Sequence, residues 1–152
     1  MHNIIFEQNK VYRHYILNII KDLSIEQLLY IPTQLNNSIL WNLGHVVVSQ
    51  QMLTYGLSGQ KMNTPIDWTP IFKIGSKGNI QFEEEQLTDL KKYMVPLIEQ
   101  TENDFALNHF ENFKPFYTGY GAKITNIHEA LAFNNYHEGN HIGHILTMKK
   151  LL

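Results

Sequence analysis

The first half of the chain contains two stretches with the hydrophobic pattern of helices. In residues 3–23 the apolar positions recur every three or four residues, which places them on one face of a helix. Residues 39–57 are apolar on nearly all sides, and a helix of this kind is usually buried. Asn37 and Ser38 directly precede this run, and both residue types favour the capping position before a helix. We therefore expect two helices, separated by a break at Pro32.

The second half of the chain predicts two further helices. Residues 83–107 begin with three glutamates, whose negative charge is favourable at the positive end of a helix dipole. Pro96 lies within this stretch and should kink the helix, because proline has no N–H to donate. Residues 126–152 form the fourth predicted helix, with Asn126 and Glu129 in the positions of a capping box.

The segments between the predicted helices have the composition of loops. Residues 59–82 are rich in proline and glycine and show no sustained period, so we expect a long crossover loop. Trp68, Ile71 and Phe72 should hold this loop against the helices. No segment has the strict alternation of a β-strand. The sequence therefore predicts an all-α fold, a four-helix bundle with a long crossover loop, in one domain spanning residues 1–152.

Length, charge and composition narrow the class of protein. The 152 residues are 43% hydrophobic and 17% charged, which is ordinary for a folded domain. The net charge of −2 provides no basic surface, so we expect neither nucleic acid nor a membrane as a partner. No signal-peptide pattern or membrane span is evident, and we expect a cytoplasmic protein. Because the chain has no cysteine, any metal must be held by His, Asp or Glu.

Three of the eight histidines share one face of the fourth predicted helix. Residues that follow one another at spacings of three and four along this helix are Ala130, Phe133, His137, His141, His144, Met148 and Leu151. This is the pattern of a bundle seam, so we expect its histidines at core positions. His2, His14 and His109 are most simply surface residues, and His128 lies about 180° around the helix from His137.

The second predicted helix turns another histidine toward the interior. Its inward positions at the same spacing are Trp41, His45, Val48, Met52 and Tyr55. A buried polar group without a partner costs about 1–3 kcal/mol, so several imidazoles facing an apolar interior need partners. Hydrogen bonds among the imidazoles and to buried water are one answer. A metal ion explains more of the pattern, because helical bundles build metal sites from facing helices.

The spacing of His137 and His141 is that of a metal-binding pair. Side chains four residues apart lie on one helix face and offer two nitrogens to one ion, as in zinc metalloproteases. The protease motif also requires a glutamate as general base. Here Glu138 follows His137 directly and points about 100° away from it, so the residues do not support a metalloprotease.

Two segments resemble the DinB/YfiT-like superfamily of metal-dependent helical proteins. They read SILWNLGHVVVSQ, residues 38–50, and HEGNHIGHI, residues 137–145, and the resemblance extends over nearly the whole chain. It implies a bundle in which one histidine of the second helix and two of the fourth bind a divalent metal ion, with water in the open positions. By motif position these ligands are His45, His137 and His141. The resemblance also implies a homodimer.

His144 departs from the family pattern, in which many relatives carry glutamine. It lies one turn beyond His141. One possibility is that His144 is a fourth ligand, and the other is that it supports the ligands or faces the substrate. We favour the second possibility, because one helix seldom delivers three nitrogens to a single tetrahedral ion. Other side chains expected near the pocket are Asn42, Ser49, Asn134, Tyr117 and Tyr120.

Three imidazole ligands leave a coordination position open, which is typical of catalytic metal sites. The resemblance implies a transferase that uses a low-molecular-weight thiol and a small-molecule substrate, and without cysteine in the chain the thiol must be diffusible. Imidazole suits zinc, nickel, copper and ferrous iron, and we expect zinc or nickel. The alternatives left open are a non-catalytic metal-binding stress or interaction protein, a metal-dependent hydrolase and a metal-free bundle.

Overall fold

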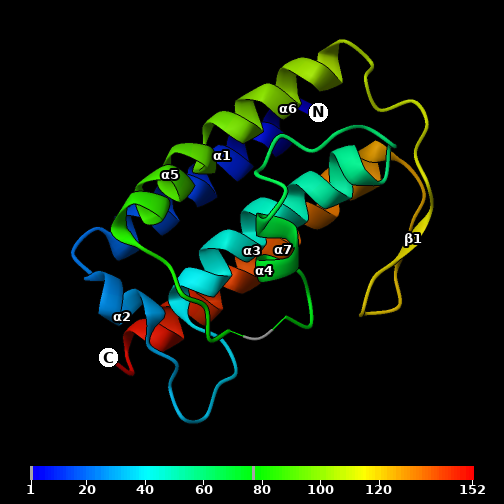
Figure 1. Cartoon of the computed structure of the whole chain (residues 1–152). Helices are drawn as coiled ribbons and strands as arrows, with labels where there is room; N and C mark the ends of the chain where they lie inside the picture. Colours follow the sequence, from blue (N-terminus) through cyan, green and yellow to red (C-terminus); the bar gives the residue numbers. More distant parts are fainter. Residues whose placement is uncertain (1, 77) are drawn as a thin grey trace.

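Long helices run side by side in the computed structural model, which describes residues 2–76 and 78–152, with side chains from residue 4 onward (Figure 1). These helices are α1 (His2–Ile20), α3 (Ile39–Gln51), α5 (Glu84–Met94), α6 (Pro96–Ala106) and α7 (Ile127–Lys149). Helix α7 packs against α1 and α3, and α1 also contacts α5 and α6. The mainly helical architecture confirms the all-α prediction. Among the described residues, no helix is both long enough and apolar enough to cross a membrane.

The predicted crossover, residues 59–82, contains a short helix of its own. This helix, α4 (Trp68–Phe72), packs on α3, and Figure 1 shows it in green beside α3. Trp68 and Phe72 are buried in the main hydrophobic core, and Ile71 packs against it. The prediction that these residues hold the segment to the bundle is therefore confirmed.

Further short elements lie in segments for which no regular structure was predicted, and these are α2 (Ile25–Leu29) and the strands β1 (Phe116–Tyr117) and β2 (Lys123–Ile124). The second predicted helix, residues 39–57, contains α3 and a π-helical turn η1 (Met52–Gly56) that extends it. The strands pair antiparallel, and the N–H of Thr118 donates to the carbonyl of Ala122 at 2.9 Å. Gly121 adopts a φ of 83° in this turn. The expectation of no strands is wrong here, because two-residue strands are too short to show alternation.

The third predicted helix is interrupted rather than kinked. Helix α5 ends at Met94 and α6 begins at Pro96, with Val95 between them. A proline in the first turn of a helix loses no hydrogen bond, because the N–H groups of that turn have no partner within the helix. The helix is thus disrupted at the predicted proline, but the disruption separates two helices instead of bending one.

The starts of α3 and α7 are set by the predicted capping residues. Ser38 accepts a hydrogen bond from the N–H of Trp41 at 3.1 Å, and Asn126 accepts one from the N–H of Glu129 at 3.0 Å. The predicted capping box is incomplete, because the carboxylate of Glu129 accepts from the N–H of Thr125 at 2.7 Å instead of from the cap residue. These caps fix where the two histidine-bearing helices begin.

Candidate metal centre

Three imidazole rings meet where α3 faces α7. His45 comes from α3, and His137 and His141 come from α7, one turn apart. Nε2 of His137 lies 3.2 Å from Nε2 of His45 and 3.1 Å from Nε2 of His141. Zinc–nitrogen bonds of about 2.0–2.1 Å at tetrahedral angles place neighbouring nitrogens about 3.3 Å apart. The structure therefore brings the three predicted residues together at a spacing that can hold one metal ion.

Hydrogen bonds to Nδ1 orient two of the three rings. Nδ1 of His45 lies 2.6 Å from the carbonyl oxygen of Phe72, and Nδ1 of His141 lies 2.7 Å from Oδ1 of Asn42. The amide of Asn42 is itself oriented, because its Nδ2 donates to the carbonyl of Ser38 at 2.8 Å. Since both oxygens can only accept, Nδ1 carries the proton in each ring and Nε2 presents a lone pair.

His137 has no such anchor. Its Nδ1 is buried without a hydrogen-bond partner among the described residues, and its ring stacks against Phe133 with centroids 6.0 Å apart. Without a cation, its Nε2–H can donate to only one neighbouring ring at a time. The hydroxyl of Ser49 lies 3.2 Å from Nε2 of His45 and can serve that ring. A cation would engage all three nitrogens at once, so the donor set fits a divalent metal ion.

Burial lowers the pKa of all three imidazoles. For His45 this effect outweighs the hydrogen bond to Phe72, which acts in the opposite direction. The pKa of His137 falls to about 4 and that of His141 to about 2, because burial disfavours the charged form and neighbouring histidines would repel an added charge. All three rings are therefore neutral at pH 7, which is the form that binds metal.

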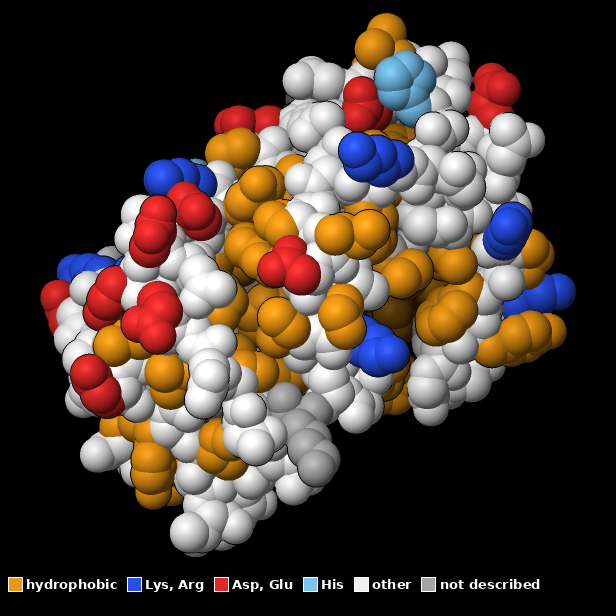
Figure 2. Space-filling view, viewed as in Figure 1, with side chains coloured by type: hydrophobic (Ala, Val, Ile, Leu, Met, Phe, Trp, Pro, Cys, Tyr) orange, Lys and Arg blue, Asp and Glu red, His pale blue; other side chains and the backbone are white. Residues whose placement is uncertain are grey.

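The histidines line a cavity of about 740 Å³ whose walls are mostly apolar. Its size is within the range of small-molecule sites. Trp41 forms part of the wall and stacks on His45, with ring centroids 4.5 Å apart and planes 13° apart. Other parts of the wall come from Val48, Ile74, Phe116, Phe133 and Met148. Figure 2 shows hydrophobic side chains gathered around a hollow on the face where Figure 1 shows α4 and β1.

Most of the other residues predicted near the pocket do line it. Asn42, Ser49 and Tyr120 are among the lining residues, and Tyr120 accepts a hydrogen bond from Asn140 at 3.3 Å. Tyr117 does not line the cavity; its neighbour Phe116 does. The prediction for Asn134 is wrong, because its side chain lies in the core between α1 and α7 and is 1% exposed.

The prediction that His144 occupies a core position is also wrong. Its side chain is exposed and borders the cavity, with its ring centroid 5.8 Å from that of His141. Helix α7 is buried at His141, but one turn further along the helix the same face borders the open pocket, and His144 is exposed there. It lies outside the group of three nitrogens that can hold an ion. His14 and His109 are exposed as predicted, and the side chain of His2 lies outside the described residues. His128, predicted to face away from His137, is exposed as well.

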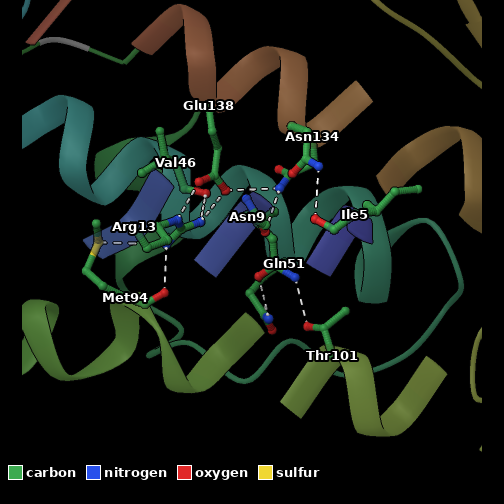
Figure 3. Close-up of polar contacts among 11 residues, drawn as sticks. Ile5, Asn9, Arg13, Val46, Gln51, Met94, Thr101, Asn134 and Glu138 are labelled. Carbon is green, nitrogen blue, oxygen red and sulfur yellow. Dashed lines mark hydrogen bonds and ion pairs between the residues drawn. The ribbon is translucent and has the colours of Figure 1, made fainter. Parts of the chain in front are cut away.

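A buried ion pair beside the histidines was missed by the sequence interpretation (Figure 3). Nε and Nη2 of Arg13 each donate to the carboxylate of Glu138 at 2.7 Å, and both side chains are fully buried. Nη2 also donates to the carbonyl of Val46 at 2.8 Å. Val46 follows His45 in α3, and Glu138 follows His137 in α7. Arg13 thus links the two helices at positions adjacent to two of the three histidines.

A signal for this pair was present in the spacing of the first helix. Arg13 belongs to a series of buried positions at alternating spacings of three and four residues, which are Phe6, Asn9, Arg13, Ile16 and Ile20. A charged side chain on the buried face of a helix requires a partner of opposite charge in the interior. The identity of the partner could not be read from the sequence, because it lies 125 residues away.

A comparison with models of protein families gives a match that covers most of the chain. A family model described as the DinB superfamily matches residues 8–145, which include all three clustered histidines. No curated protein matches the chain in sequence.

Proposed function

Because the chain belongs to the DinB superfamily and gathers three neutral imidazoles, we propose that it binds one divalent metal ion through His45, His137 and His141. The observation that carries this proposal is the convergence of the three Nε2 atoms, 3.1 and 3.2 Å apart, at the wall of an open cavity. Zinc and nickel are the expected ions, since both accept imidazole nitrogen.

The proposed reaction is the transfer of a low-molecular-weight thiol to an electrophile that has an apolar body. When bound, a divalent ion supplies Lewis-acid chemistry, lowering the pKa of a thiol in its open coordination position. The sulfur forms a bond to the electrophilic carbon, the carbon's bond to its leaving group breaks, and the thiol proton passes to solvent. The cavity supports this proposal, because its mostly apolar wall suits a hydrophobic acceptor.

The chain's own residues have separable roles in this proposal. Phe72 and Asn42 hold the rings of His45 and His141 with Nε2 directed at the ion. Trp41 covers one face of His45 and excludes water from it. His144, exposed at the cavity and outside the group of three nitrogens, is available to exchange a proton with the substrate.

Metal analysis of protein purified without a nickel column tests the first part of the proposal. We expect about one zinc or nickel per chain in the wild type and none in His141→Ala. The second part is tested by following the consumption of small thiols in the presence of haloaromatic and epoxide acceptors. Thiol consumption by the wild type that is lost in His141→Ala, and on chelation, supports the transferase. Metal binding without any response of a Co²⁺ spectrum to thiols would exclude it.

Two other functions use the same centre and give different outcomes. A hydrolase would activate water instead of a thiol, so turnover of ester or amide substrates without thiol would identify it. A non-catalytic metal-binding stress or interaction protein would bind metal and convert no substrate in either assay. The open cavity beside the histidines favours a site that admits a small molecule.

A cytoplasmic homodimer remains part of the proposal. The dimer is supported by the family membership of the chain. The cytoplasmic location is supported by the composition of the chain. Light scattering on the purified protein measures the mass in solution, and a monomer would remove the dimer from the proposal.

A further inference from the structure

The cavity is lined by a positively charged side chain and by no negatively charged one among the described residues. Among the described residues that line it, Lys73 is the only permanently charged one, and no aspartate or glutamate is present. The three clustered histidines add no negative charge, because imidazole is either neutral or positive. The polar lining groups that remain are amides, hydroxyls and the exposed His144. The cavity therefore has one positive charge and no compensating negative charge.

Lys73 lines the cavity at a position where it is exposed to solvent. It follows α4 directly, and its own N–H donates to the carbonyl of Thr69 at 3.0 Å, which fixes its backbone. The side chain is exposed, and no ion pair is recorded for its ammonium among the described residues. Charge interactions are less screened beside apolar walls than on an open surface.

We propose that the cavity takes an amphipathic organic anion, with an aromatic or aliphatic body against Trp41 and Phe133 and its anionic group beside Lys73. The apolar wall recognises the body, and the single uncompensated lysine recognises the charge. This names the substrate class for the proposed function. A divalent ion held by three neutral histidines would add positive charge to the same cavity, so metal loading should strengthen the preference for anions.

Isothermal titration of chelator-treated protein tests the proposal independently of metal. The probes are 2-naphthoate and the uncharged 2-naphthamide, which have the same apolar body. We expect the wild type to bind naphthoate about fivefold more tightly than naphthamide, and Lys73→Met to lose this preference while still binding naphthamide. Lys73→Arg should retain the preference. Lys21→Met is the matched control, since Lys21 is exposed and does not line the cavity.

Equal affinity of the wild type for the two probes would overturn the proposal, and so would binding of neither probe at millimolar concentration. A preference that survives Lys73→Met would also overturn it. Because these titrations use metal-free protein, a failure of metal binding leaves their outcome unchanged. The two proposals can therefore fail separately.

The buried ion pair supports a second inference, which rests on the proposed metal site. Arg13 contacts Val46 and Glu138, the residues that follow His45 and His137 (Figure 3). Its guanidinium also donates to the carbonyl of Met94 at 3.3 Å, so it is held from three helices besides its own. We infer that Arg13 is a positioning residue that sets the separation of the two helices carrying the histidines.

The double variant Arg13→Met/Glu138→Gln tests this inference, because it removes the link without leaving an unpaired charge in the core. We expect it to fold and to bind Zn²⁺ about tenfold more weakly in competition with a chromophoric chelator. Thr101→Val is the control: it removes the 2.8 Å hydrogen bond from Gln50 between α3 and α6, and it should leave the metal affinity unchanged. A metal-free readout is the ¹⁵N chemical shifts of the imidazoles of His45 and His137, which should change only in the double variant.

Zinc affinity within twofold of the wild type, or unchanged imidazole shifts, would show that the ion pair serves stability alone. If the double variant does not fold, Arg13→Lys keeps the positive charge but loses the paired donors of the guanidinium, and it is measured in the same two assays. Unchanged values in that variant would equally reject the positioning role. If the wild type binds no metal, the metal-site proposal fails, and the imidazole shifts still decide the role of Arg13.

Discussion

Replacing Gly44 by alanine should disturb the proposed metal centre without altering any of the three histidines. Gly44 directly precedes His45 in α3 and faces α4. A Cβ at this position would lie 2.3 Å from two ring carbons of Phe72, whereas ordinary contacts are 3.4–4 Å. The ring must therefore move by about 1 Å. It has little room to do so, because Phe72 is fully buried and packs edge-on against Phe82 and Trp68.

The movement should be transmitted to His45, because the carbonyl of Phe72 accepts the hydrogen bond from its Nδ1. Overpacking of this size costs about 1–3 kcal/mol, and alanine in a helix returns about 1 kcal/mol relative to glycine. The net loss is up to about 2 kcal/mol, which corresponds to a melting temperature lower by roughly 4–8 °C for a chain of this length. Loss of the orienting hydrogen bond should weaken metal binding about tenfold.

Gly139→Ala is the matched control. Gly139 lies between His137 and His141 in α7, and a Cβ there would meet nothing within 4 Å. This variant should be about 0.5–1 kcal/mol more stable than the wild type and should bind metal equally well. Thermal unfolding of chelator-treated protein and Zn²⁺ competition measure both quantities. Wild-type stability and affinity in Gly44→Ala would refute the reasoning, and a loss of stability alone would show that the Phe72 carbonyl is not needed to orient His45.

Three further predictions follow from the same geometry. His45→Ala, His137→Ala and His141→Ala should each lose the metal while circular dichroism shows helical content close to wild type; full metal content in any one would remove that residue from the ligand set. His144→Ala should retain the metal and change turnover, and loss of metal would make it a ligand. The free energy of unfolding of metal-free protein should fall as the pH decreases from about 6.5 to 4. The pKa of His137 is depressed to about 4, so the unfolded chain takes up the proton first. At pH 5 this one residue accounts for up to about 2 kcal/mol, and urea titrations at pH 7, 6 and 5 that show constant stability would contradict the depressed pKa.

Local features of the sequence determined the helices and the candidate ligands. Hydrophobic periodicity and capping preferences act within a few residues, so Ser38 and Asn126 could be identified as the starts of two helices. The same period placed His137 and His141 one turn apart on one face and His45 on the inward face of another helix. That these three share one site was implied by the family resemblance, and the structure brings their Nε2 atoms together. Their role as metal ligands stays a prediction.

Tertiary packing alone decided the surroundings of these histidines. The acceptor for His45 is the carbonyl of Phe72, 27 residues away, and no side-chain pattern reports where a backbone carbonyl will lie. The predictions for Asn134 and His144 were wrong in opposite directions, because Asn134 lies in the core and His144 borders the open pocket. Helical spacing gives the face on which a residue lies, but not whether another element covers that part of the face. The partner of Arg13 was fixed only when α1 and α7 packed together. Periodicity assigns residues to faces of helices, whereas contacts between distant elements depend on how those faces meet. This is why the sequence could indicate the candidate ligands but not the groups that orient them.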